Sequence, residues 1–359
     1  MILYKIFKKV NTINIIIIIK KIIWCINLIN RILDKAVNGD TLEKEEILTL
    51  FKINNEEDLK NLMKTAEEIR NKNFKAIKLT STIHLTNKCQ ITPKCKYCGF
   101  AAKTSTDGYY NAFYKKDDEI LVAAKCVDES GIPRISCSGA HGYKGKQAVN
   151  AARIVKENTK LQLLINIGSD LTEKSLQQLA DYNTDTICCN LETTNNDLFN
   201  EVKPGEKLSD RINTCKMVSN YGIELSSGLL IGLGESYEDR VNHLLFLNNF
   251  ESLGEIPIMG FNPYADTPMA NHPPCPLDEQ LKTIAITRLV YPEIRITTPT
   301  PTIGPENASY SLKAGSNNLA TVIPEDYPSV VKGVGSPTYG NLNEVLKLLD
   351  SLNLKAEHN

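Results

Sequence analysis

The feature of this sequence that most restricts its fold is a regular alternation of short apolar segments with longer amphipathic ones. Eight segments have the length and apolar content of buried strands: 78–86, 132–140, 161–168, 184–192, 223–233, 255–263, 293–298 and 317–323. Helical patterns lie between them, for example over 146–158 and 208–222. This order is typical of a parallel sheet with crossover helices. It predicts an α/β chain folded as a (β/α)8 TIM-type barrel.

Segments rich in polar residues and glycine follow the predicted strands. They are the cysteine-containing stretch 86–100, "SGAHG" at 138–142, "NLETTN" at 190–195, "GLGES" at 232–236 and "NPYADTPM" at 262–269. The carboxyl ends of the strands of such a barrel meet at one rim, which is where its sites lie. These segments are therefore expected to lie close together.

The barrel accounts for most, but not all, of the chain. We expect N-terminal helices over 28–75, the barrel over 76–325 and a closing C-terminal helix within 326–359. Residues 1–27 form an atypical extension, and the stretch "NTINIIIIIKKIIWCINLIN" at 11–30 is almost entirely Ile, Lys and Asn. Lys20 and Lys21 interrupt its apolar run, and no small-residue cleavage site follows, so neither a membrane span nor a signal peptide is expected. An appended helix, an upstream start codon and a membrane-surface helix remain open for this extension.

Charge and cysteine usage narrow the classes of partner and the compartment. The formal net charge is −1, which gives no electrostatic footprint for nucleic acid or anionic lipid. The ten cysteines include several inside apolar strand-like runs, unlike the loop cysteines of disulfide-rich secreted domains. We therefore expect a cytoplasmic protein whose thiols are buried or bound to metal.

Three cysteines, Cys89, Cys95 and Cys98, lie within ten residues in "TNKCQITPKCKYCGF". A structural zinc site would need a fourth ligand, and His84 and His141 do not have the spacing of a zinc finger or ribbon. Three thiolates at the rim of a barrel instead favour an iron–sulfur cluster with one iron left open for catalysis.

This motif resembles that of the radical S-adenosylmethionine (SAM) superfamily, in its branch with biotin synthase, methylornithine synthase and the [FeFe]-hydrogenase maturase of the HydE type. The resemblance covers roughly residues 28–320. It implies that Cys89, Cys95 and Cys98 hold a [4Fe–4S] cluster whose open iron binds SAM. It also implies that one electron cleaves SAM to methionine and a 5′-deoxyadenosyl radical. Tyr97 matches the aromatic residue that precedes the last cysteine.

The first gap departs from the usual C-x3-C-x2-C spacing, because five residues separate Cys89 from Cys95. A C-x5-C-x2-C loop resembles the HmdB (HcgA) family, which is linked to synthesis of the guanylylpyridinol ligand of [Fe]-hydrogenase. That resemblance implies carbon–carbon bond formation or rearrangement on a small polar precursor. Pro93 could stiffen the longer loop, but the sequence gives no reason for its length.

The resemblance also implies a SAM pocket built from the rim segments. Its expected members are Tyr97, Ser138, Gly139, Ala140, Asn190, Glu192, Arg211, Ser227, Ile231 and Asn262, with Thr267 as a further polar contact and His141 as a possible acid or base. Gly139 allows close backbone approach, and a carboxylate at Glu192 suits ribose hydroxyls. Arg211 carries a planar fork that pairs with carboxylates, such as that of the methionine end.

The second cluster of biotin synthase, which donates sulfur, is not expected here. In that enzyme it is held by cysteines on strands 2, 3 and 5 and by an arginine. Cys137 and Arg295 fit two of these positions, but Leu164 and Ser226 occupy the others. Sulfur insertion is therefore not expected, and the remaining strand and helix cysteines (Cys126, Cys188, Cys189 and Cys215) are interpreted as buried thiols.

The sequence thus predicts a radical SAM enzyme that acts on a small-molecule substrate and receives electrons from an external one-electron reductant such as ferredoxin or flavodoxin. An amino-acid skeleton mutase like methylornithine synthase is one alternative, and it would need arginine and carboxylate groups facing each other beside the SAM site. A non-catalytic iron–sulfur scaffold for hydrogenase assembly is another, and a zinc-binding structural barrel is a more distant one.

Overall fold

The computed structural model describes residues 28–101, 112–328 and 340–357. Eight parallel strands form a closed barrel: β1 (Lys78–His84), β2 (Arg134–Ser138), β3 (Gln162–Asn166), β4 (Thr186–Cys188), β5 (Glu224–Ser226), β7 (Leu253–Gly260), β8 (Arg295–Pro299) and β9 (Asn318–Ala320). They pair in this order, and β9 returns to β1. The predicted (β/α)8 fold is confirmed. The predicted extension 1–27 lies outside the described residues.

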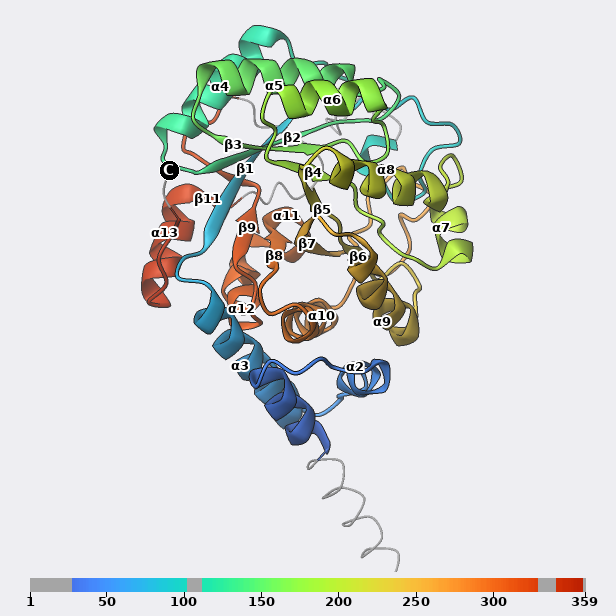
Figure 1. Cartoon of the computed structure of the whole chain (residues 1–359), viewed down its shortest axis with the longest axis vertical. Helices are drawn as coiled ribbons and strands as arrows, with labels where there is room; N and C mark the ends of the chain where they lie inside the picture. Colours follow the sequence, from blue (N-terminus) through green and yellow to red (C-terminus); the bar gives the residue numbers. More distant parts are fainter. Residues whose placement is uncertain (1–27, 102–111, 329–339, 358–359) are drawn as a thin grey trace, which may run out of the picture.

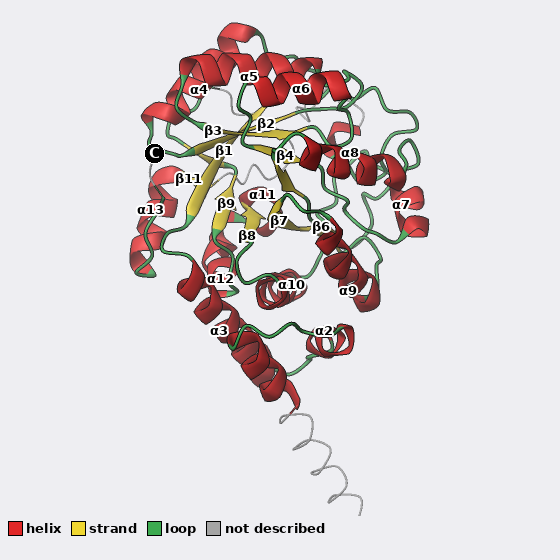
Figure 2. Ribbon diagram, in the orientation of Figure 1, coloured by secondary structure: helices red, strands yellow, loops and turns green. Residues whose placement is uncertain are grey.

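Helices surround the strands, as Figures 1 and 2 show. The layer contains α4 (Asp117–Glu129), α5 (Lys146–Asn158), α6 (Glu173–Asp181), α7 (Asn196–Val202), α8 (Leu208–Asn220), α9 (Tyr237–Phe246), α10 (Leu277–Val290), α12 (Ala308–Lys313) and α13 (Leu342–Ser351). The short helix α11 (Thr300–Ile303) lies within the ring of strands in this view and contacts β7 and β8. Short 3-10 turns lie at η1 (Gly99–Ala101), η2 (Leu247–Asn249) and η3 (Pro305–Asn307), and β10 (Val322–Ile323) pairs with β11 (Gly340–Asn341). The helix expected near the C-terminus is α13.

The apolar core lies between the strands and the helices. The strand residues Ile135, Ile165 and Ile187 are fully buried, and α5 turns small residues such as Ala148 and Ala151 toward them. Small residues let a helix approach a sheet closely, and the branched strand residues fill the space between them. This packing fixes the strand ends, and so the positions of the rim loops.

The N-terminal helices form a layer outside the barrel (Figure 1). Residues 28–37 are helical, and α2 (Lys44–Phe51) and α3 (Glu56–Asn73) follow. α3 packs against α10, which explains why even polar residues of α10 such as Thr287 are fully buried. Among the described residues, no helix is long and apolar enough to cross a membrane.

The fifth strand differs from the expectation of one continuous segment over 223–233. It breaks into β5 and β6 (Leu229–Ile231), and β6 pairs with β7. At the break, Ser227 N donates to Glu255 O, and the register between β5 and β7 shifts. Gly228 lies so near the Pro257 carbonyl that a side chain at this position would clash. This close approach bends the strand toward the rim.

A layer of ion pairs closes the amino-terminal end of the barrel. Arg134 donates from both Nη atoms to the Glu255 carboxylate, each at 2.8 Å, and both side chains are 1% exposed. Arg295 bridges Glu224 at 2.7 Å and Glu255 at 3.3 Å. Thr80, Thr297 and Asn318 complete the hydrogen bonding. Two guanidinium groups therefore balance two carboxylates inside the barrel.

Candidate functional site

The cysteine loop leaves the carboxyl end of β1, as predicted. Cys89, Cys95 and Cys98 are half-buried and form no disulfide. Burial raises the pKa of Cys95 and raises that of Cys98 to about 11, while the Lys203 ammonium opposes both shifts. Among the described residues, no three His, Cys, Asp or Glu side chains are gathered as a metal-binding group, but the charges of Cys89 and Cys95 are near enough to raise the pKa of Cys98.

The residues between Cys89 and Cys95 pack against other segments of the rim. Gln90 N donates to His141 O at 2.9 Å, and a Cβ atom on Gly142 would lie 2.4 Å from Gln90 Cβ. Farther along, a Cβ atom on Gly205 would lie 2.2 Å from Pro93 O. The loop thus packs closely against two other rim segments, and at each contact the neighbouring residue is a glycine. This contact gives a physical role to the residues between Cys89 and Cys95.

Replacing Gly205 with alanine should unseat this part of the loop. The new methyl group meets a backbone oxygen, which cannot rotate away, so we expect a loss of about 1–3 kcal/mol in the free energy of unfolding and faster proteolysis between residues 90 and 94. Urea denaturation and limited proteolysis measure these effects. Pro204→Ala, at the exposed neighbouring position, is the matched control. Equal behaviour of the two variants would contradict the packing role.

A network of charged side chains lies beside the loop, on the rim formed by α7, α8 and the loop after β2. The Glu206 carboxylate, which is 5% exposed, receives Lys203 Nζ at 2.9 Å, Arg211 Nη2 at 2.9 Å and His141 Nδ1 at 3.1 Å. Lys203 Nζ also donates to Tyr97 Oη at 3.2 Å and lies 5.4 Å from the centre of that ring. The network therefore joins the predicted residues Tyr97, His141 and Arg211.

The pKa values of the two carboxylates of this region, Glu206 and Glu192, are shifted in opposite directions. Burial alone would raise the pKa of Glu206, but the hydrogen bond from His141 and the charges of Arg211 and Lys203 hold it well below its usual range. Burial raises the pKa of Glu192, against the opposing charges of Lys203 and Arg211. Glu206 is thus a fixed anion, whereas Glu192 is protonated more readily than an ordinary glutamate.

Two buried polar atoms of the network have no hydrogen-bond partner among the described residues: Arg211 Nε and Glu192 Oε2. The other end of the Arg211 guanidinium is occupied, because Nη1 donates to Asn190 O and Nη2 to Glu206. An unpartnered buried donor or acceptor costs about 1–3 kcal/mol. A ligand group that bonded to either atom would remove this cost.

Asn190 and Glu192 are two residues apart, a spacing that would put them on one face of a strand, but they do not lie in a strand. β4 ends at Cys188, and Glu192 has a positive φ of 66°, which breaks the alternation of side chains. Asn190 Oδ1 accepts a hydrogen bond from Gly228 N at 2.9 Å, and Glu192 bridges to Leu229. Both residues still lie at the rim, held against the break in the fifth strand.

The other predicted pocket residues have varied surroundings. Ser227 is buried and donates to Cys189 O at 2.9 Å, and Ile231 is 1% exposed within the apolar core. Ala140 N donates to Thr86 O, which ties the turn at 138–140 to the start of the cysteine loop. Asn262 is exposed and donates to Thr302 O, so no hydrogen bond joins it to the charged network.

Cys137 does not face the barrel interior, so its predicted match to a ligand of the second biotin synthase cluster is wrong. Arg134 crosses the interior to Glu255, and alternation along β2 turns the residue three positions later outward. Cys137 is fully buried in the core between strands and helices. Arg295, the other predicted match, is engaged by Glu224 and Glu255.

Sequence reasoning missed Lys203, Glu206 and Ser169, whose Oγ donates to Glu206 at 3.0 Å. Ser169 lies in the β3–α6 loop, and Lys203 and Glu206 lie in the "KPGEK" turn between α7 and α8. Neither segment carries an obvious sequence motif. A turn rich in Pro and Gly is usually interpreted as a solvated connection. The packing of Gly205 on the cysteine loop, together with the side-chain contacts of Lys203 and Glu206, makes this turn part of the site.

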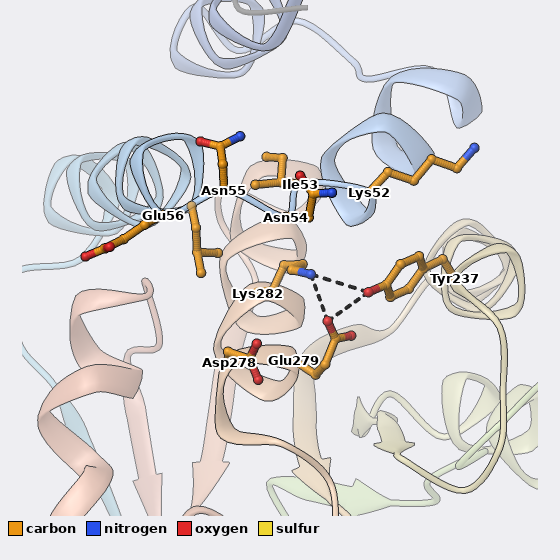
Figure 3. Close-up of a pocket in the computed structure, with 10 residues that line it drawn as sticks. Lys52, Ile53, Asn54, Asn55, Glu56, Tyr237, Asp278, Glu279 and Lys282 are labelled. Atoms are coloured by element: carbon orange, nitrogen blue, oxygen red, sulfur yellow. Dashed lines mark hydrogen bonds and ion pairs between the residues drawn. The ribbon is translucent and has the colours of Figure 1, made fainter.

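A separate cavity of about 500 Å3 lies where the turn between α2 and α3 meets α9 and α10, and its lining contains no rim residue of the site (Figure 3). Its buried cation, Lys282, donates to Glu279 at 2.8 Å and to Tyr237 Oη and Phe51 O at 3.4 Å. Its polar groups thus satisfy one another, which is typical of structural packing between layers.

Comparison with known proteins agrees with the geometry. The family model described as the Radical SAM superfamily matches residues 83–247, and the Biotin and Thiamin Synthesis associated domain matches residues 257–322. An uncharacterized protein of Methanocaldococcus jannaschii is 56% identical, over 90% of this chain and 86% of its own length. Biotin synthase of Clostridium botulinum is 31% identical, over 73% of this chain and 81% of its own length.

Solved structures share the fold. Methylornithine synthase (PylB) superposes with a TM-score of 0.81 at 20% identity, covering 91% of this chain and 97% of its own. The [FeFe]-hydrogenase maturase HydG from Carboxydothermus hydrogenoformans has a TM-score of 0.78 at 19% identity, covering 91% and 78%. Together with the sequence relatives, these findings show that the chain belongs to the radical SAM superfamily and is a radical SAM enzyme with a [4Fe–4S] cluster and SAM as cofactors.

Proposed function

We propose that this enzyme acts in synthesis of the guanylylpyridinol cofactor of [Fe]-hydrogenase, by carbon–carbon bond formation or rearrangement on a small polar precursor. The observation that carries this proposal is the C-x5-C-x2-C loop, whose spacing is that of the HmdB family. The packing of the added residues on Gly142 and Gly205 supports it, because it makes the longer loop an integral part of this rim.

Cys89, Cys95 and Cys98 would hold the cluster. The donor set fits: three thiols on one half-buried loop, none in a disulfide, with the buried Lys203 ammonium nearby to favour the thiolate form. Bound there, the cluster supplies the electron that cleaves SAM to methionine and a 5′-deoxyadenosyl radical. The barrel keeps water from the reacting groups and orients the substrate.

The SAM pocket would use the two unpartnered buried atoms. Arg211 Nε is available to the methionine carboxylate, and Glu192 Oε2 to a ribose hydroxyl. Tyr97, held by Lys203, would bound the pocket on the side of the cysteine loop. The remaining predicted contacts (Ser138, Gly139, Ala140, Asn190, Ser227, Ile231 and Asn262) and an acid or base role for His141 complete the proposal.

The barrel interior disfavours sulfur insertion of the biotin synthase type. The cysteine ligands of the second cluster are missing, since Cys137 turns outward and Leu164 and Ser226 carry no thiol. A mutase of the methylornithine synthase type needs arginine and carboxylate groups that face each other beside the SAM site. The interior ion pairs of Arg134 and Arg295 lie at the other, amino-terminal end of the barrel, so the assay below is what tests this alternative.

The test is an anaerobic assay of SAM cleavage. The cluster is reconstituted, SAM and a strong reductant are added, and 5′-deoxyadenosine is measured with and without a small-molecule extract of hydrogen-metabolising cells. We expect the extract to stimulate cleavage, and fractionation then identifies the precursor. Stimulation by a pure amino acid alone would indicate the mutase.

Absence of cleavage with an intact [4Fe–4S] signal would favour an iron–sulfur scaffold over the proposed enzyme. In the proposed setting the chain works in the cytoplasm with an external one-electron reductant, such as ferredoxin or flavodoxin. The cleavage assay with a chemical reductant does not depend on that donor, so it separates the chemistry from its electron supply.

A further inference from the structure

Four lysines with exposed side chains surround the cysteine loop: Lys88, Lys94, Lys144 and Lys207, here called the lysine collar. The whole chain carries a formal net charge of −1, with 41 basic and 42 acidic residues. A group of four cations at one place is therefore a local feature and does not reflect the overall composition.

Contacts between three chain segments bring the collar together. Tyr143 Oη donates to Lys88 O at 2.8 Å, which places Lys144 beside the start of the cysteine loop. Lys94 Nζ donates to Cys89 O within the loop itself. Gly205 packs on Pro93 O, so Lys207 lies two residues from the same contact. The collar thus lies on the rim, on and beside the cysteine loop.

The collar is not neutralised by the protein. Among the described residues, no ion pair involves any of its four lysines, although many other lysines of the chain are paired. The nearby carboxylate of Asp170 accepts hydrogen bonds from the backbone N–H groups of Gly142, Tyr143 and Lys144. Glu206 is enclosed by Lys203, Arg211 and His141. The collar ammonium groups therefore have no carboxylate partner in the described part of the chain, and those of Lys88, Lys144 and Lys207 are open to an external anion, whereas that of Lys94 donates to Cys89 O.

An exposed aromatic side chain accompanies the collar. Tyr114 is 52% exposed, and its ring meets the Tyr143 ring edge-on with 6.2 Å between centres. Tyr143 in turn contacts Lys88. Aromatic anchors inside a charged rim are typical of protein–protein interfaces, where tyrosine contributes binding energy and the charges speed association. Tyr114 and the collar together have this arrangement.

We propose that the lysine collar and Tyr114 form the docking surface for a small acidic protein that delivers single electrons to the cluster. This rests on the proposed cluster site at Cys89, Cys95 and Cys98. One electron passes from the reduced carrier to the cluster, so the carrier is oxidised by one electron and no bond forms or breaks. Charge complementarity selects an acidic carrier, and the position over the cysteine loop shortens the electron's path.

The experiment compares two electron donors for the reconstituted enzyme. The variant Lys88→Glu/Lys207→Glu keeps Lys94, which contacts the cysteine loop. The control Lys60→Glu/Lys347→Glu makes the same charge change at exposed positions on α3 and α13. Cluster reduction is followed by its visible and EPR signals, with reduced flavodoxin or with photoreduced 5-deazariboflavin, an uncharged small donor, at low and at high salt.

We expect the collar variant to be reduced by flavodoxin about tenfold or more slowly at low salt, with a smaller difference at high salt. Reduction by deazariboflavin should change less than about twofold, and the control should match the wild type with both donors. An unchanged flavodoxin rate, an equal loss with both donors, or an equal loss in the control would each overturn the docking surface. Tight salt-dependent binding of duplex DNA that blocks flavodoxin would instead assign the surface to nucleic acid.

Because cluster reduction is read directly, the result stands whether or not SAM is cleaved. Failure of SAM cleavage alone therefore counts against the proposed function and leaves the docking surface intact. Calorimetric binding of oxidised flavodoxin to the enzyme gives a second readout. Binding that is weakened in the collar variant but not in the control supports the proposal, and equal binding by all three proteins contradicts it.

Discussion

Replacing Cys98 with alanine should abolish both cluster binding and SAM cleavage. Cys98 is the last thiol of the motif, and burial raises its pKa to about 11, so it has little thiolate character without a metal. Bound iron stabilises the thiolate and overcomes this cost. The two thiols that remain are too few to hold the cluster. We expect iron and sulfide contents near zero after reconstitution, and 5′-deoxyadenosine at the level of a blank without enzyme.

The matched control is Cys126→Ala, which removes a half-buried thiol on α4, outside the cysteine loop. This variant should bind iron and sulfide like the wild type. Circular dichroism of both variants verifies that the barrel has folded. A Cys98→Ala protein that retained the full visible spectrum of the cluster would show that the ligand set is wrong. A Cys126→Ala protein that lost it would show that the effect is not specific to the loop.

The fold could be predicted because its signal is repeated many times along the chain. Each buried strand is a short apolar run, each helix has its own periodicity, and parallel strands connected by helices have few alternative arrangements. The same logic placed the cysteine loop, the turn at 138–142 and Asn190 on one rim. Errors in single elements, such as the break between β5 and β6, did not alter that arrangement.

The side of the sheet to which an individual side chain points was harder to predict than the fold. A shift of one residue in the start of a strand turns every side chain to the other face, and no residue near Cys137 marks that start. Contacts between distant loops were also invisible. Lys203 contacts Tyr97 and Glu206 contacts His141, and Gly205 between them packs on Pro93 across more than a hundred residues of sequence. Neither residue belongs to a motif that would have indicated the contact.

The ion pairs at the amino-terminal end of the barrel should have the largest effect on stability. Replacing Glu255 with methionine leaves the Arg134 guanidinium buried without a carboxylate, and we expect a loss of about 3–5 kcal/mol in the free energy of unfolding. Replacing both partners by methionine removes the stranded charge and should restore most of the loss. Arg153→Met, at an exposed pair with Asp117, should change stability by less than about 1 kcal/mol. Urea denaturation measures all three.

Acid provides an independent check of the same pair. Burial would raise the pKa of Glu255, but Arg134 and Arg295 and their hydrogen bonds lower it from 4.5 to about 2. A lowered pKa in the folded state means that this ionisation stabilises the fold above pH 4.5, and that the contribution is lost as the pH falls toward 2. Removing Glu255 removes that contribution, so the free energy of unfolding of the double methionine variant should fall less steeply than that of the wild type between these values. Parallel acid profiles for the two proteins would mean that Glu255 is not held ionised by the arginines, and would contradict a charge-paired barrel base.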